Sequence, residues 1–238
     1  MLEYTTMKKA RISFYIDGFN IYHRLKDYQQ KTKTSYKWLD YKSLCNSLLK
    51  ENEILADVYF FTALSKDFGE ESITRHSKYI TALELQGVKI IRGYFNKRQR
   101  KCRVEDCTYQ GNKYFIDREE KQTDVNISLQ LMQDAALNKY DKCFLMSGDN
   151  DFAPILKTVM QLYPDKQVGI ITPPYQEKVI KSPNMVHLKS ACYHDLKTNK
   201  RLIINLGFDK LNGHSLPTII KNEIGNVLVE MPKEYSVF

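Results

Sequence analysis

Aspartates follow two apolar runs of this 238-residue sequence, at the point where each run ends. Asp17 closes the run over residues 11–16, and Asp149 and Asp151 follow the run over residues 142–147. Carboxylate oxygens are the preferred ligands of hard cations such as Mg²⁺ and Mn²⁺. Two such ions can stabilise the attacking and the leaving oxygen when a phosphodiester is displaced in line. The spacing therefore predicts phosphodiester chemistry, provided that the fold brings these acids together.

A further carboxylate comes from residues 121–138, where apolar side chains recur at helical spacing. At about 100° per residue, Asp124 falls on the same side as Leu131 and Ala135, and this side should face a sheet. Asp134 falls toward the polar side and should be solvated. An inward carboxylate needs a partner, because burying an unpaired charge is costly. Singly, each of the predicted site acids has a simpler role as a turn residue or helix cap, so it is their convergence that indicates a site.

The alternation of apolar runs with helical patterns predicts the scaffold that must position these acids. Five runs are typical of buried strands: 11–16, 58–64, 88–92, 142–147 and 167–172. Helical patterns lie between them over 19–31, after Asp40, and over 70–85, 121–138 and 151–162. This alternation predicts an α/β fold with a mostly parallel five-stranded sheet and helices on both faces. In the strand order 3-2-1-4-5, Asp17 and Asp149 would meet at the switch point, where open α/β sheets bind ligands.

Two regions break the alternation. Residues 96–117 lose periodicity and gain charge, which predicts an irregular loop. After residue 191 the pattern weakens, with short strands expected at 202–205 and 227–230.

The segments that carry the acids resemble the NYN domain, in the LabA-like branch of the PIN-like nucleases. The resemblance rests on three motifs in order: Tyr15-Ile-Asp-Gly-Phe-Asn-Ile21, then Glu120-Lys-Gln-Thr-Asp-Val-Asn-Ile127 with Asp134-Ala135 downstream, then Ser147-Gly-Asp-Asn-Asp-Phe152. It places the domain at residues 10–190. Residues 191–238 resemble the family's C-terminal extension, packed on the domain or trailing from it.

The resemblance implies a Rossmann-like PIN fold and a divalent-metal-dependent nuclease, with RNA rather than DNA as the expected substrate. Cleavage by such a nuclease would leave a 5′-phosphate and a 3′-hydroxyl. Carried over by position, the metal-binding and catalytic acids are Asp17, Asp124, Asp149 and Asp151, which would hold Mg²⁺ or Mn²⁺. Asn20 and Ser147 become supporting site residues, and Lys121 joins them as a cation that could face a scissile phosphate. Asn150 stands where the family more usually has Ser, and a neutral polar residue there removes no ligand.

A cluster of cations precedes the helix of Asp124 and consists of Lys97, Arg98, Arg100, Lys101 and Arg103. The simpler interpretation is a solvated charged loop. The alternative is a nucleic-acid-binding loop at the rim of the acidic site, since basic side chains supply sequence-independent affinity for phosphates. Cys102 and Cys107 share this segment, but structural zinc normally takes four ligands. We therefore expect free thiols and no zinc there.

Composition narrows the function classes. The 36 Lys and Arg residues against 28 Asp and Glu residues give a net charge of +8, which fits a polyanionic partner. Five scattered cysteines do not form a disulfide framework, and no apolar run approaches the roughly 20 residues of a membrane span. A G-x-S-x-G elbow is absent from the sequence, which argues against a serine hydrolase. We expect a cytoplasmic protein that binds nucleic acid and no membrane, and we leave a homodimer open. The alternative to a nuclease is a nucleic-acid-binding or regulatory module with little turnover.

Overall fold

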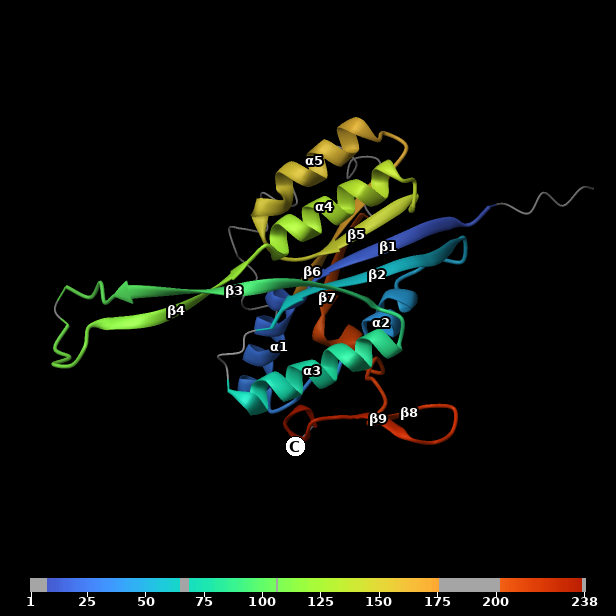
Figure 1. Cartoon of the computed structure of the whole chain (residues 1–238). Helices are drawn as coiled ribbons and strands as arrows, with labels where there is room; N and C mark the ends of the chain where they lie inside the picture. The colour runs from blue at the N-terminus through green and yellow to red at the C-terminus, as the bar shows by residue number, and fades with distance from the viewer. Residues whose placement is uncertain (1–7, 65–68, 106, 176–201, 237–238) are drawn as a thin grey trace, which may run out of the picture.

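A computed structural model of the chain describes residues 8–64, 69–105, 107–175 and 202–236. Its centre is one sheet in the order β4-β3-β2-β1-β5-β6-β7 (Figure 1). The strands are β1 Ala10–Asp17, β2 Glu53–Ala63, β3 Lys89–Lys101, β4 Tyr114–Lys121, β5 Lys142–Met146, β6 Gln167–Tyr175 and β7 Ile203–Gly207. All pair in parallel except β4, which is antiparallel to β3. The predicted α/β class and the predicted order of the five parallel strands are confirmed, but the sheet has seven strands rather than five.

Helices cover both faces of this sheet. The helices α1 Gly18–Thr32, α2 Tyr41–Ser47 and α3 Glu70–Leu85 lie on one face, and α4 Thr123–Ala136 and α5 Ala153–Leu162 lie on the other (Figure 1). Successive side chains of β1 point to opposite faces, so Phe14 and Ile16 join the core under α1 to α3, while Tyr15 joins the core under α4 and α5. Burial on both faces explains why the strands are nearly continuous apolar runs.

The region 96–117, predicted as an irregular loop, is strand at both of its ends, so that prediction is wrong there; only its described middle part, 102–105 and 107–113, is irregular. Strand β3 continues to Lys101 and pairs with β4 as a two-stranded ribbon that extends away from the body (Figure 1). The side chains of Tyr94, Phe115 and Ile116 are exposed there. Because the ribbon has no buried face, its sequence shows neither a continuous apolar run nor alternation.

The prediction that Asp134 is solvated is also wrong. Its carboxylate is fully buried and accepts hydrogen bonds from the Tyr15 hydroxyl at 2.8 Å and from Gln130 Nε2 at 2.9 Å. Lys139 Nζ lies 3.0 Å from the same carboxylate. A helical-wheel angle cannot reveal this burial, because it depends on a tyrosine that reaches across from the sheet.

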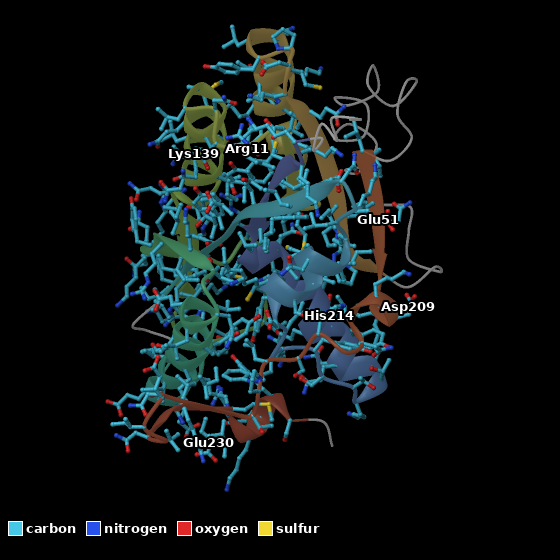
Figure 2. All side chains as sticks on the ribbon, turned by 90° about the vertical axis from the view of Figure 1, so that its right-hand side faces the viewer. Arg11, Glu51, Lys139, Asp209, His214 and Glu230 are labelled. Atoms are coloured by element: carbon cyan, nitrogen blue, oxygen red, sulfur yellow. The ribbon has the colours of Figure 1, made fainter. Side chains whose placement is uncertain are left out.

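The described C-terminal segment first adds β7 to the sheet beside β6 and then packs on the face of the sheet that α1, α2 and α3 cover. It comprises β7, the 3-10 helix Phe208–Leu211, the hairpin β8 Ile219–Lys221 and β9 Val227–Glu230, and the 3-10 helix Lys233–Tyr235. Asp40 N donates to His214 O at 2.8 Å, and Leu216 N donates to Trp38 O at 3.0 Å. Figure 2 labels His214 in this segment. The expected strands near 202–205 and 227–230 are therefore present. The proposed domain boundary at residue 190 lies outside the described residues and stays a prediction.

Among the helices of the described chain, none is both long and apolar enough to span a bilayer.

Candidate active site

The ends of β1 and β5 place the first and last motifs side by side. The two strands pair in parallel with Ile16 opposite Met146, so Asp17 and Ser147 leave the sheet at the same edge. After β1 the chain enters α1 on one face, and after β5 it enters α5 on the other (Figure 1). This divergence is the topological switch point at which open α/β sheets form their sites.

Asp17 lies deepest in this site, with only 5% of its surface exposed. It caps α1, because Oδ1 accepts a hydrogen bond from Asn20 N at 3.1 Å, and Oδ2 accepts one from Ser147 Oγ at 2.8 Å. Burial raises the pKa of Asp17 to about 6, against the effect of these two donors, and the charges of Asp124 and Asp149 add to the rise. The carboxylate is thus buried, supported on both oxygens, and repelled by its acidic neighbours.

A short hydrogen-bond chain joins the turn after β1 to the turn after β5. Gly148 N donates to Asn20 Oδ1 at 3.2 Å, and Ser147 Oγ accepts from Asp149 N at 3.1 Å while donating to Asp17. Asp149 Oδ1 in turn accepts from Asp151 N at 3.0 Å and caps the 3-10 helix Asn150–Phe152. Asn20 and Ser147 therefore hold the acid-bearing turns together.

Asp124 enters from the first turn of α4. Burial raises its pKa, and the charges of Asp149 and Asp151 raise it further, so the three carboxylates lie within electrostatic reach of one another. By accessible surface, however, Asp124 is exposed, and the expectation that it is buried against the sheet is wrong. It is only the second residue of α4, beyond the carboxyl edge of the sheet, so solvent reaches it although surrounding protein partly desolvates it.

Glu120, the first residue of the second motif, is an acid of this site that was not predicted from the sequence. Thr123 Oγ1 donates a hydrogen bond to Glu120 Oε1 at 2.6 Å. Burial raises the pKa of Glu120 to about 7 despite this donor, and Asp17 and Asp124 add to the rise. Its position four residues before Asp124 could have indicated a second acid of the site. Because the segment before it was predicted to be an irregular loop, nothing in the sequence indicated the direction of the Glu120 side chain. Lys121, by contrast, forms an ion pair with Glu119 at 2.6 Å.

The turn that leads into α4 is tightly constrained. Gln122 has a φ of 72°, in the left-handed region where glycine is the easiest residue. Gly93 of β3 lies against this turn, since a Cβ there would be 2.5 Å from Lys121 O and 2.6 Å from Thr123 Oγ1. The close approach fixes where α4 begins and therefore where Asp124 lies.

The chemistry of these side chains fits a hard divalent cation. All the candidate donors are oxygens, and like charges that raise one another's pKa are relieved by a cation. Asn150 Oδ1, between Asp149 and Asp151 in sequence, is buried without a hydrogen-bond partner in the described structure. Within the described ranges, no three His, Cys, Asp or Glu side chains converge closely enough to form a metal-binding group. The structure thus gathers acids at one edge, and their role as ligands stays a proposal.

The opposite edge of the sheet is electrostatically different. At the amino-terminal end of β1, Arg11 Nη2 lies 2.8 Å from Asp141 Oδ1, and Arg11 also donates to Asn138 O beside Lys139 (Figure 2). Hydrogen bonding from Arg11 lowers the pKa of Asp141 to about 2. Acids are matched by cations at this edge, whereas burial and mutual repulsion raise the pKa of Asp17, Asp124 and Glu120 at the other.

The other predicted residues lie on or near the ribbon. Lys97, Arg98, Arg100 and Lys101 belong to β3 rather than to a loop, and Arg103 follows its end. Cys102 and Cys107 are free thiols.

A mostly parallel α/β sheet with carboxylates at its switch point is compatible with the PIN-like nuclease domains. The model of the NYN domain, a member of that superfamily, matches residues 11–195. This chain belongs to the NYN domain family.

Two known proteins are similar to the chain. It is 26% identical over 191 residues to 6-hydroxy-3-succinoylpyridine 3-monooxygenase HspA of Pseudomonas putida (strain DSM 28022 / S16), a match that covers 68% of this chain and 59% of that relative. The chain therefore spans less than two thirds of the relative's length. Its fold resembles the crystal structure of a protein of unknown function from Vibrio parahaemolyticus RIMD 2210633, with a TM-score of 0.52 and 15% identity, over 86% of this chain and 97% of the other. That likeness concerns the fold alone.

Proposed function

We propose that this protein is a divalent-metal-dependent nuclease that hydrolyses phosphodiester bonds in RNA. The observation that carries the proposal is that Asp17, Asp124 and Asp149 lie at the same edge of the sheet, near enough for the charges of Asp124 and Asp149 to raise the pKa of Asp17. Membership of the NYN family supports the same reaction class.

In this proposal Asp17, Asp124, Asp149 and Asp151 hold Mg²⁺ or Mn²⁺, and Glu120 adds to the negative potential that attracts the ion. When bound, the ion would neutralise the phosphate and activate water for attack at phosphorus. The protein's own contribution is positioning, because a correctly held reactant pair avoids much of the entropic barrier. The hydrogen bonds from Ser147 and Asn20 to Asp17 supply that positioning.

Cleavage of a mixed RNA pool tests the proposal. The wild-type protein should cleave RNA in Mg²⁺ or Mn²⁺, and EDTA or the substitution Asp149→Asn should abolish cleavage. Asp141→Asn is the matched control, because it removes the same charge from the opposite edge of the sheet. Cleavage that survives in EDTA, or in folded Asp149→Asn protein at the wild-type rate, would refute the assignment.

The same assay separates a nuclease from a binding module with little turnover. Metal-dependent RNA binding without cleavage would favour the binding module, and a parallel DNA pool would show which nucleic acid is preferred. The Pseudomonas relative is named for a monooxygenase reaction, and the chain covers 59% of that relative's length. Consumption of 6-hydroxy-3-succinoylpyridine by the same preparation would check it directly.

A further inference from the structure

Helix α1 carries a row of aromatic side chains outside its buried stripe. Ile21 and Leu25 are buried and join the core beneath the helix. Phe19, Tyr22 and His23 are spaced i, i+3 and i+4, so at about 100° per residue they lie side by side but outside that buried stripe. Tyr22 is 39% exposed, and His23 is exposed as well. Helix positions that face solvent are usually polar, so this aromatic stripe, as we call the three side chains, needs a reason.

The rings of the aromatic stripe hold one another in place. The ring centroids of Phe19 and His23 are 4.4 Å apart with an interplanar angle of 79°, and those of Tyr22 and His23 are 5.9 Å apart at 72°. Edge-to-face contacts of this kind are attractive. The stripe is therefore an ordered surface before any ligand arrives.

The aromatic stripe begins beside the acids of the site. Phe19 follows Asp17 by two residues, and its ring lies 5.9 Å from the ring of Phe95 on β3. Phe95 is opposite Glu120 in the β3–β4 ladder, so these two side chains share a face. The charge of Asp17 contributes to the raised pKa of Glu120. The stripe is thus continuous with the acidic site on the side of β3.

Cations accompany the rings. Burial lowers the pKa of His23, and the charge of Lys26 lowers it further against a smaller opposite effect of Asp27. Lys37 Nζ lies 5.8 Å from the centroid of the Tyr22 ring. Burial lowers the pKa of Lys37, and Lys26 again adds to the change, so the two ammonium groups are within electrostatic reach of each other.

This combination fits one class of ligand. Surfaces that bind single-stranded nucleic acid combine cations that contact phosphates with aromatic rings on which bases stack. In a duplex the faces of the bases are covered by neighbouring pairs, whereas an unpaired strand can place its bases on aromatic side chains. The net charge of +8 favours a polyanion for the chain as a whole.

We propose that the aromatic stripe of α1 stacks on unpaired bases of single-stranded RNA next to the acids at the switch point, so that the protein prefers single strands to duplex. The placing of a phosphodiester at the acids rests on the proposed nuclease function. Stacking on the stripe does not require cleavage and can be measured without metal.

A double variant of the full chain, Tyr22→Ala/His23→Ala, forms the test. Its matched control is Leu162→Ala, which removes a 62% exposed apolar side chain at the end of α5 on the other face of the sheet. The probe is a short single-stranded RNA that carries 2-aminopurine, a base whose fluorescence is quenched when it stacks. Binding is followed at neutral pH in EDTA across a salt series, with light scattering to report the oligomeric state.

The double variant should bind the RNA about 5- to 150-fold more weakly than wild type for each stacked base lost, and the quenching of 2-aminopurine should disappear. The slope of log K against log salt should not change, because the lowered pKa leaves His23 uncharged at neutral pH and neither substitution removes a cation. Tyr22→Phe/His23→Phe keeps both rings and should bind and quench like wild type. Leu162→Ala should do the same.

If the alanine variant does not fold, Tyr22→Leu/His23→Leu takes its place, because leucine keeps the apolar volume without a ring. Wild-type binding by the folded variant, an equal loss in Leu162→Ala, or wild-type binding of duplex as tightly as single strand would overturn the proposal. A change of oligomeric state in the double variant alone would show that the stripe contacts a second copy of the chain, which also overturns it.

The assay also separates this proposal from the nuclease. Ring-dependent binding and quenching without metal-dependent cleavage would support the aromatic stripe and refute the nuclease. Metal-dependent cleavage at the wild-type rate by the double variant, with wild-type binding, would support the nuclease and refute the stripe.

Discussion

Replacing Asp17 by Asn should abolish cleavage and yet stabilise the metal-free protein at neutral pH. Asp17 is 5% exposed, and burial raises the pKa of its carboxyl group to about 6 from a usual value of 3.8. Each pKa unit corresponds to about 1.4 kcal/mol, so the buried charge at neutral pH costs up to about 3 kcal/mol of stability. Asn keeps an oxygen that can accept from Asn20 N and carries no charge. We expect a gain of about 1 to 3 kcal/mol, or a rise in Tm of about 3 to 10 °C.

The pH dependence follows from the sign of this pKa change. Since the folded-state pKa of Asp17 lies above the unfolded value, the folded protein binds the proton more tightly. That stabilisation is fully present below pH 3.8 and is lost as the pH rises through about 6. The advantage of Asp17→Asn over wild type should therefore grow between about pH 4 and pH 8. Thermal denaturation in EDTA across this range measures it, and added Mn²⁺ should raise the Tm of wild type more than that of the variant.

Asp141→Asn is the control, because the fold lowers the pKa of Asp141 and raises that of Asp17, so the two substitutions should change stability in opposite directions. Hydrogen bonding from Arg11 lowers the pKa of Asp141 to about 2, so this variant should be less stable than wild type at neutral pH, with the difference shrinking as the pH falls toward 2. The reasoning about Asp17 would be refuted if Asp17→Asn were less stable than wild type in EDTA at neutral pH. An advantage that did not change with pH would refute it equally.

Three further substitutions test individual contacts. Tyr15→Phe should lower the free energy of unfolding by about 1.5 to 3 kcal/mol in urea denaturation, because the hydroxyl donates to the buried carboxylate of Asp134 at 2.8 Å. Gly18→Ala should cost about 1 to 3 kcal/mol, seen as a lower Tm, because a Cβ would lie 2.4 Å from the ring of Phe60; an unchanged Tm would contradict the packing. Glu120→Gln should weaken Mn²⁺ binding severalfold in calorimetry, and wild-type affinity would place Glu120 outside the site.

The parallel core was predictable from the sequence because its strands are buried on both faces. Apolar runs such as residues 11–16 and 142–147 have no simpler explanation, and the alternation with helices leaves few strand orders. Asp17 and Asp149 end such runs, so their meeting followed from the order of the strands. The ribbon gave no comparable signal because its side chains are exposed on both faces.

The burial of Asp134 and the position of Glu120 depend on tertiary contacts, which the periodicity of the sequence does not reveal. Asp134 is buried because the Tyr15 hydroxyl and Lys139 compensate its charge. Glu120 faces the acids because β4 exists and its register places Glu120 opposite Phe95. Both arrangements depend on tertiary contacts, and no apolar run or alternation in the sequence marks the strand that carries Glu120.

The strands of the β3–β4 ribbon can gain or lose residues without moving side chains to the opposite face only if the number of residues is even. Among the described residues, none between Arg92 and Lys121 belongs to either hydrophobic core, so insertions and deletions there should leave the body folded. A single-residue deletion in β3 near Gly93 would move every later side chain of that strand to the other face, and Arg98 and Arg100 would take the places of Lys97 and Gln99. Removing two residues from each strand would keep every remaining side chain on its present face and would only shorten the ribbon. The ribbon should therefore tolerate changes of even length and be sensitive to changes of odd length.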